Sequence, residues 1–207
     1  MNLNEDKDWT GNKNSCWYTL CASNHAKIDT ERQVNDYYAT DPKALELLLN
    51  KLEEDNIKLH NNIWECACGE GHLSKLLINK GYNVYSSDKI DRGYGEIKDF
   101  LTVNEENIQK DILTNPPYKY AQDFIEKALN IIADDYYVVM FLKIQFLEGK
   151  TRRRLYKQGN LKYVYVNSER QNCAKNGDFH KYKNNAMCYC WFIWQKGFKG
   201  NPIIRWL

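Results

Sequence analysis

The sequence lacks several features that would place it in a specialised class. No apolar run approaches the roughly 20 residues that a membrane-spanning helix needs, and the first residues, MNLNEDKDWTGNKN, are too polar and acidic for a secretory signal. The seven cysteines form no spaced disulfide or zinc framework. We therefore expect free thiols in a cytoplasmic protein with no membrane segment and no metal site.

A strong charge imbalance is also missing. The formal net charge is only +2 over 207 residues, so the total charge does not establish a nucleic-acid partner, and any basic surface must be local. Hydrophobic residues make up 43% of the chain, which is enough for one buried core. Because residues 1–35 are polar and weakly patterned, we expect an N-terminal arm there and a single domain over residues 36–207.

Helix-like and strand-like segments alternate from Thr40 onward. Thr40, Asp41 and Pro42 form a helix start, with a capping side chain followed by proline in the first turn. Such alternation predicts an α/β fold with a doubly wound, mostly parallel, seven-stranded sheet (Rossmann-like) that ends in an antiparallel hairpin. The predicted strands cover 62–66, 82–87, a segment near 99–102, 111–114, 136–142, 161–166 and 186–194, and the later helices cover 71–80, 120–133 and about 149–158.

The segment from Glu65 to Gly71, ECACGEG, here called the glycine loop, follows a predicted strand and opens a predicted helix. Gly69 and Gly71 allow a tight turn and a close approach to a ligand, and the helix start offers free amides. Asp88 ends the next strand, where a carboxylate can accept both hydroxyls of a ribose. Each feature alone also fits a simple turn or a solvated strand end, but together they predict a nucleoside-bearing cofactor.

The tetrapeptide Asn115-Pro116-Pro117-Tyr118 follows the predicted strand 111–114. An exocyclic amino group is a poor nucleophile because its lone pair is delocalised into the ring. The Asn115 side-chain carbonyl and the Pro116 backbone carbonyl can accept its two hydrogens and stabilise the charge that grows on nitrogen. The prolines stiffen the loop, and Tyr118 can stack on a flipped base. A rigid turn after a strand is the alternative interpretation.

Taken in order, these motifs resemble those of DNA adenine-N6 methyltransferases, in particular small forms common in phages and prophages. The resemblance covers the chain from about residue 38 to its end. It implies S-adenosylmethionine as cofactor, DNA as partner and Asn115 through Tyr118 as the catalytic motif. It further implies that Thr40 faces the methionine part of the cofactor, that Asp88 holds the ribose, and that Asp99 and Phe100 lie beside the adenine ring. The residues that would wrap the cofactor are Glu65, Cys66, Ala67, Gly69 and Gly71.

Two departures from the family pattern stand out. The family's loop often reads Asp-Pro-x-x-Gly-x-Gly, whereas here the acidic start is Glu65 and small residues replace the proline. A large target-recognition domain is also absent, so the resemblance does not imply a long recognition sequence.

Basic residues downstream of the tetrapeptide are candidates for contacts with DNA phosphates. Some cluster near a predicted basic helix, and others lie in the polar loop 167–185, which also carries aromatic residues. An ordinary solvated helix face and a plain surface loop are the alternatives. The candidates are Lys143, Lys150, Arg152, Arg153, Lys175 and Lys181.

Other functions are compatible with the same motifs. The tetrapeptide also serves methylation of RNA adenines and of protein glutamine side chains, whose nitrogens pose the same chemical problem. A basic groove beside the site would favour nucleic acid. A non-catalytic binding module that kept the fold is a third hypothesis, although such a module would not need both the glycine loop and the tetrapeptide.

Overall fold

The computed structural model describes residues 38–157, 160–169, 173–175 and 187–207. All of them belong to the compact unit Tyr37–Leu207. The arm expected over residues 1–35 lies outside the described residues. None of the described helices has the length and apolarity that spanning a bilayer requires.

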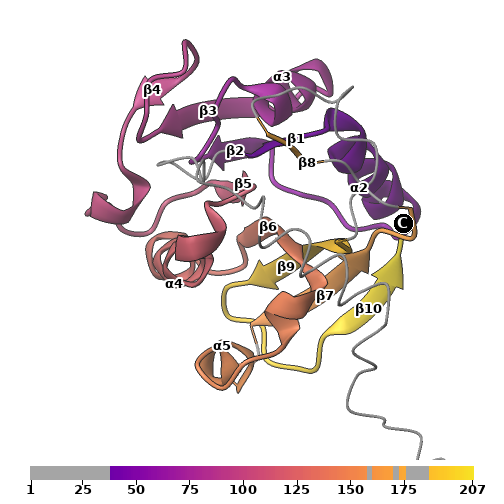
Figure 1. Ribbon diagram of the computed structural model, residues 1–207. Helices are drawn as coiled ribbons and strands as arrows, with labels where there is room; N and C mark the ends of the chain where they lie inside the picture. Colours follow the sequence, from indigo (N-terminus) through magenta and orange to yellow (C-terminus); the bar gives the residue numbers. More distant parts are fainter. Residues whose placement is uncertain (1–37, 158–159, 170–172, 176–186) are drawn as a thin grey trace, which may run out of the picture. The chain divides into compact units, whose positions relative to one another are not determined.

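The core of this unit is an eight-stranded sheet with the order β10-β7-β9-β6-β5-β2-β3-β4 (Figure 1). Neighbouring strands from β6 through β5, β2 and β3 to β4 pair in parallel, and so do β7 and β10, whereas β9 is antiparallel to both β6 and β7. The strands are β2 (Asn62–Glu65), β3 (Asn83–Asp88), β4 (Glu96–Ile97), β5 (Asp111–Thr114), β6 (Tyr137–Lys143), β7 (Leu161–Val166), β9 (Tyr189–Gln195) and β10 (Ile203–Trp206).

The predicted fold class is confirmed, with one strand more than expected. Six of the seven predicted strands are present. The strand expected near 99–102 is wrong: Asp99 caps a 3-10 turn over Phe100–Thr102, and the strand in this region is β4, just before it. Strand β10, which pairs in parallel with β7, was not predicted. The predicted antiparallel pair of β7 and β9 is present, but β9 also pairs with β6 over its whole length, so it lies inside the sheet. A separate two-stranded sheet joins β1 (Tyr38–Thr40) to β8 (Cys173–Lys175).

Helices cover both faces of the large sheet, as a doubly wound fold requires. Adjacent strand residues point to opposite faces: Trp64 packs in one apolar cluster with Ile125 of α4, and Ile63 packs in the other with Leu48 of α2 and Leu77 of α3. The helices are α2 (Pro42–Glu54), α3 (His72–Asn79), α4 (Ala121–Ile131) and α5 (Arg153–Lys157), with short 3-10 turns at Phe100–Thr102, Tyr118–Tyr120 and Ile144–Leu147.

The helix start predicted near residue 41 is confirmed. Asp41 is the N-cap of α2, where its carboxylate accepts a hydrogen bond from the Lys43 amide at 3.0 Å, and Pro42 opens the helix. Helix α2 buries Ala44, Leu45, Leu48 and Leu52 against the sheet.

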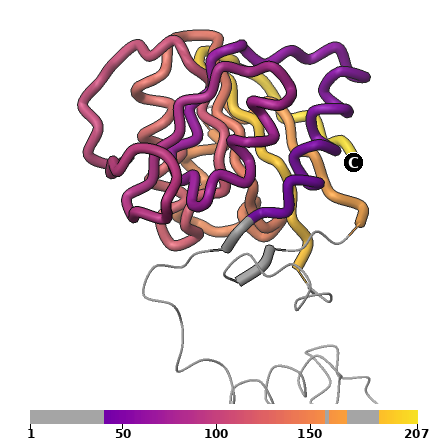
Figure 2. The backbone as a smooth tube through the Cα atoms, turned by 90° about the horizontal axis from the view of Figure 1, so that it is seen from above, coloured from indigo at the N-terminus to yellow at the C-terminus, as the bar shows by residue number. Residues whose placement is uncertain are grey.

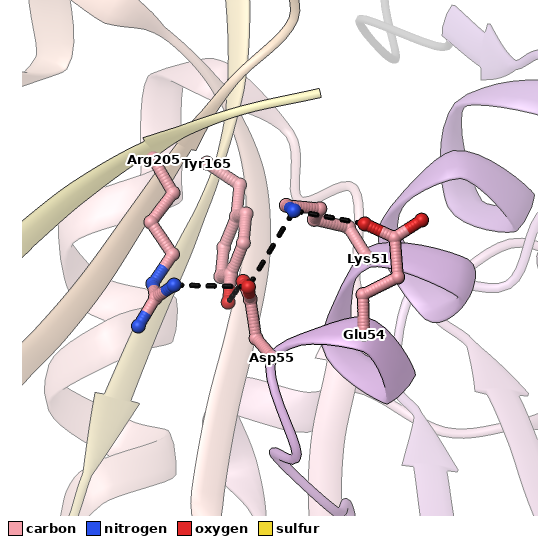
Figure 3. Close-up of polar contacts among 5 residues, drawn as sticks. All are labelled: Lys51, Glu54, Asp55, Tyr165 and Arg205. Atoms are coloured by element: carbon pink, nitrogen blue, oxygen red, sulfur yellow. Dashed lines mark hydrogen bonds and ion pairs between the residues drawn. The ribbon is translucent and has the colours of Figure 1, made fainter.

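Asp55, at the end of α2, ties this helix to the added edge of the sheet (Figure 3). Its carboxylate accepts a hydrogen bond from the Tyr165 hydroxyl at 2.8 Å and pairs with the Arg205 guanidinium at 2.9 Å and the Lys51 ammonium at 3.5 Å. Because Tyr165 lies on β7 and Arg205 on β10, one carboxylate fixes α2 against both strands. Figure 2 shows α2 beside the C-terminal strand from a second direction.

Candidate functional site

The candidate residues follow neighbouring parallel strands and therefore meet at one edge of the sheet. The glycine loop follows β2, Asp88 is the last residue of β3, Asn115 follows β5, and Lys143 is the last residue of β6. These four strands are adjacent in the order β6-β5-β2-β3. The segments that the sequence singled out are thus brought together by the topology.

Asp88 binds the glycine loop directly. One carboxylate oxygen accepts a hydrogen bond from the Gly69 amide at 2.9 Å, and the other accepts one from the Ile90 amide at 2.9 Å. The Cys68 amide also donates to the Ser87 carbonyl at 3.0 Å. The acid expected to hold a ribose therefore also fixes the loop that would surround the cofactor.

Gly71 is required by a protein contact that the sequence did not reveal. It lies at the start of α3 with a φ of 78°, and a Cβ at this position would come within 2.4 Å of the Tyr94 ring. The Lys75 ammonium lies 5.0 Å from the centroid of the same ring. The group that approaches Gly71 closely is thus the ring of Tyr94, in the connection between β3 and β4. No sequence pattern around Tyr94 indicates this contact.

Glu65, at the start of the glycine loop, is buried. It is 2% exposed and accepts a hydrogen bond from the Ser74 hydroxyl, which also shares a hydrogen bond of 2.7 Å with the Ser86 hydroxyl. Burial raises the pKa of Glu65 from 4.5 to about 8, and the nearby charge of Asp88 adds to this. A neutral carboxyl here is a structural link between β2, α3 and β3.

The two loop cysteines are buried thiols. Burial raises the pKa of the Cys66 thiol well above its ordinary value and that of Cys68 to about 12, so both stay protonated near neutral pH. Among the described residues, no group of three or more His, Cys, Asp or Glu side chains could hold a metal ion. Small size and packing explain why cysteine fits at these positions.

Thr40 contributes a buried hydroxyl near the glycine loop. Its strand, β1, contacts α3, the helix that begins directly after Gly71. The residue is 3% exposed, and its hydroxyl has no hydrogen-bond partner among the described residues. A buried polar group of this kind is usually satisfied, so an external ligand would account for it.

The pair Asp99 and Phe100 differs from the expectation in one respect. The Asp99 carboxylate pairs with the Lys89 ammonium at 2.8 Å, which lowers the pKa of that carboxyl, and it accepts a bond from the Leu101 amide. Phe100, by contrast, is 1% exposed, with its ring edge-on to Trp64 at 5.2 Å. Phe100 is therefore a core residue in this structure, and its contact with a cofactor stays a prediction.

The tetrapeptide forms a compact turn at the end of β5. Asn115 is half-buried with its Oδ1 covered, and Pro116 is buried. The Tyr120 amide donates to the Pro117 carbonyl at 2.8 Å, which closes a 3-10 turn that begins at Tyr118. This turn presents Tyr118 on the same edge as the glycine loop.

The Tyr118 ring is held by two residues from the centre of the sheet. Its centroid lies 6.1 Å from that of Tyr189, with the planes 27° apart, and the Lys143 ammonium lies 5.2 Å from its centroid. Tyr189 stacks in turn on Phe141 at 5.1 Å. Sequence reasoning proposed Lys143 and Tyr118 separately and did not detect that they are in contact.

The basic candidates near α5 are not equivalent. Arg152 lies over the Phe146 ring at 4.6 Å, and the neighbouring Arg154 forms a bidentate pair with Glu126 of α4. Lys150 and Arg153 are exposed. Of the remaining candidates, Lys175 belongs to β8, where only the backbone is described, and Lys181 lies outside the described residues.

Comparisons with known proteins support the fold. No protein-family model matches the chain, and no curated protein matches its sequence. A solved structure assigned as a class I S-adenosylmethionine-dependent methyltransferase from Listeria monocytogenes is 14% identical with a TM-score of 0.55, covering 91% of this chain and 70% of that chain. A structure assigned as an RNA methyltransferase from Pyrococcus horikoshii is 16% identical with a TM-score of 0.57, covering 86% and 97%.

A third neighbour is the methyltransferase subunit of a type I restriction-modification system from Streptococcus thermophilus. It is 14% identical with a TM-score of 0.55, and the match covers 86% of this chain and 54% of that one. At these identities the likeness concerns the fold, and this chain has the Rossmann-like fold of class I methyltransferases.

Proposed function

We propose that this protein transfers a methyl group from S-adenosylmethionine to the exocyclic N6 of adenine in DNA. The observation that carries the proposal is the placement of Asn115-Pro116-Pro117-Tyr118 at the end of β5, beside the glycine loop at the end of β2. The tetrapeptide, which can bind an amino nitrogen, is thus next to the glycine loop, which suits a nucleoside cofactor, on one edge of the sheet.

The residues around the glycine loop fit the cofactor. Asp88 has carboxylate lone pairs left after its two backbone bonds, and these would accept hydrogen bonds from the ribose hydroxyls. The unsatisfied, buried Thr40 hydroxyl would bind a polar group of the methionine part. When bound, S-adenosylmethionine supplies an electrophilic methyl group on a positively charged sulfur.

Asn115 and Pro116 would bind the amino group that receives the methyl. The Asn115 side-chain carbonyl and the Pro116 backbone carbonyl accept one amino hydrogen each, which favours a tetrahedral nitrogen and stabilises its developing positive charge. Because Oδ1 of Asn115 is covered in this structure, the side chain must turn toward the target as the base enters. Tyr118 provides the aromatic surface on which the extruded base stacks.

The nearby carboxyl groups do not have the properties of a general base. Glu65 is buried, bonded to Ser74 and has a pKa of about 8, and Asp88 is bonded to two backbone amides. Catalysis would rest on positioning and on the two carbonyl acceptors, and the proton would leave from the positively charged product nitrogen to solvent.

Charge beside the tetrapeptide favours a nucleic-acid substrate over a protein glutamine. Lys143 touches Tyr118, and Lys150 and Arg153 are exposed further along the same connection. The restriction-modification neighbour supports DNA. RNA adenine is the second candidate, because the Pyrococcus horikoshii neighbour is assigned as an RNA methyltransferase.

Transfer of labelled methyl groups tests the proposal. The full chain is incubated with labelled S-adenosylmethionine and, in separate reactions, with unmethylated duplex DNA, unmodified RNA and a glutamine-containing peptide mixture. Nucleoside mass spectrometry should detect N6-methyldeoxyadenosine in the DNA digest. Label that enters only RNA or peptide would overturn the DNA assignment, and failure to bind S-adenosylmethionine by calorimetry would overturn the whole proposal.

A further inference from the structure

The ring of Tyr118 has a cation resting on it. The Lys143 ammonium lies 5.2 Å from the ring centroid, inside the range of about 6 Å in which an aromatic face attracts a cation. Lys143 is the last residue of β6, whereas Tyr118 follows the neighbouring strand β5. The contact therefore joins the catalytic tetrapeptide to the end of the next strand.

Lys143 and Tyr189 form a fixed base for this contact. They are direct partners in the antiparallel pairing of β6 with β9. Tyr189 is 4% exposed and stacks on the buried Phe141 with the ring planes 15° apart. Because Lys143 and Tyr189 both stand on central strands, they link the Tyr118 ring to the buried part of the sheet.

Among the residues that the structure describes, no acid neutralises the charge of Lys143. In the part of the chain that the structure describes, no carboxylate lies within ion-pair distance of its ammonium, and the residue is half-buried. Other lysines at the site differ in this respect, since Lys89 pairs with Asp99 at 2.8 Å. The Lys143 ammonium can thus leave the ring for an anion without breaking an ion pair with any described residue.

We propose that Lys143 is a positioning residue that covers the stacking surface of Tyr118 until the target base arrives and then binds a phosphate of the same strand. This inference rests on the proposed function, in which Tyr118 stacks on the base. In this proposal the ammonium and the base occupy the same face of the ring in turn, and a base stacked on an aromatic side chain is held more strongly than a partly exposed cation. The phosphate then compensates for the lost contact.

Competition for the ring predicts opposite effects on two ligands. Deoxyadenosine has a base but no phosphate, so removal of the ammonium should help it bind. A single-stranded oligodeoxyadenylate has both, and it should lose a phosphate contact when the charge is removed. A lysine with a purely structural role would weaken both ligands together.

Binding of both ligands is measured by calorimetry at several salt concentrations, with S-adenosylhomocysteine present, for wild type, Lys143→Met, Lys143→Arg and the control Lys58→Met. Lys58 is exposed in the connection before β2, at the opposite edge of the sheet. Lys143→Met should bind deoxyadenosine several-fold more tightly and the oligonucleotide several-fold more weakly. The slope of log K against log salt should fall by about 0.7, the value for one contact to a single strand. Lys143→Arg should keep the wild-type slope, and Lys58→Met should match wild type throughout.

Several outcomes would overturn the role of Lys143. These are a parallel loss of both ligands in Lys143→Met, an unchanged salt slope, or a wild-type protein that binds neither ligand. Thermal unfolding of each variant shows whether a loss of binding is due to misfolding. If Lys143→Met is misfolded, the salt slope of Lys143→Arg decides, because it should equal that of wild type. If the two ligands respond in opposite directions but DNA is never methylated, the role of Lys143 stands and the proposed function fails.

Discussion

Asp88 accepts a hydrogen bond from the amide of Gly69 at 2.9 Å, so the acid at the end of β3 and the glycine loop after β2 form one unit. Hydrogen bonds to a charged group contribute about 1.5–3 kcal/mol, which corresponds to roughly 10–100-fold in affinity. We therefore expect Asp88→Asn to weaken S-adenosylmethionine binding by a factor in that range, measured by isothermal titration calorimetry. Asp91→Asn is the matched control, because the Asp91 carboxylate accepts a hydrogen bond from the Gly93 amide within its own connection and, among the described residues, none from the glycine loop. Equal affinity of the two variants would contradict the role of Asp88.

Asn115→Ala should separate turnover from cofactor binding. In the proposed mechanism its carbonyl accepts a hydrogen bond as charge develops on the target nitrogen, and removal of one such acceptor should lower kcat by about 100–1000-fold. The Kd for S-adenosylmethionine should stay within about twofold, because the loss falls on the transition state. Asn62→Ala, an exposed asparagine at the start of β2, serves as control in the same methyl-transfer assay. A collapse of cofactor affinity in Asn115→Ala would show that the residue has been misassigned.

Glu65 should make the stability of the protein depend on pH. Its pKa in the folded protein is about 8, above the 4.5 of an exposed carboxyl, so the folded state holds the proton more tightly than the unfolded state. The stabilising contribution is complete below about pH 4.5 and is lost as pH rises toward 8. Glu65→Gln should remove this dependence, which has a maximum slope of about 1.4 kcal/mol per pH unit.

Urea unfolding of wild type and Glu65→Gln across this pH window checks the expectation. As pH rises through this window, the free energy of unfolding of wild type should fall relative to that of Glu65→Gln. A constant difference would mean that the carboxyl is ionised in the folded protein at neutral pH.

Gly71→Ala should destabilise the glycine loop for two reasons. A non-glycine residue at a φ of 78° is strained, and the added Cβ would lie 2.4 Å from the Tyr94 ring. Gly81→Ala has a similar positive φ of 93° but no atom within 4 Å of its Cβ, so it reports the strain alone. We expect Gly71→Ala to lower the free energy of unfolding by about 1–3 kcal/mol more than Gly81→Ala. Adding Tyr94→Ala should recover part of that difference, and purely additive effects would contradict the contact.

The sequence predicted the fold class and the location of the site through different signals. Strand-helix alternation and the cap at Asp41 were sufficient for the doubly wound sheet. Because parallel strands end at one edge, the positions of Asp88 and Asn115 after their strands placed them beside the glycine loop without any knowledge of contacts. The roles given to these residues remain predictions.

Other features had no signal that sequence reasoning could use. Strand β10 is an edge strand with three of its four residues exposed, so it shows neither the alternation of a half-buried strand nor the full burial that an apolar run would indicate. The contacts of Tyr94 with Gly71 and of Lys143 with Tyr118 join side chains from separate connections, and neither segment shows a pattern that depends on its partner. Phe100 was assigned by resemblance to a cofactor surface, whereas its packing on Trp64 depends on three-dimensional burial.

The insertion of β9 between β6 and β7 also sets the order in which this protein can fold during synthesis. The free edge of β6 and the inner edge of β7 have no partner in the large sheet until residues 189–195 have left the ribosome. The Tyr118 ring stacks on Tyr189 of that late strand, so the turn that carries Tyr118 gains this contact only when the sheet is complete. Nascent chains halted before residue 189 should therefore expose two unpaired strand edges and depend on chaperones.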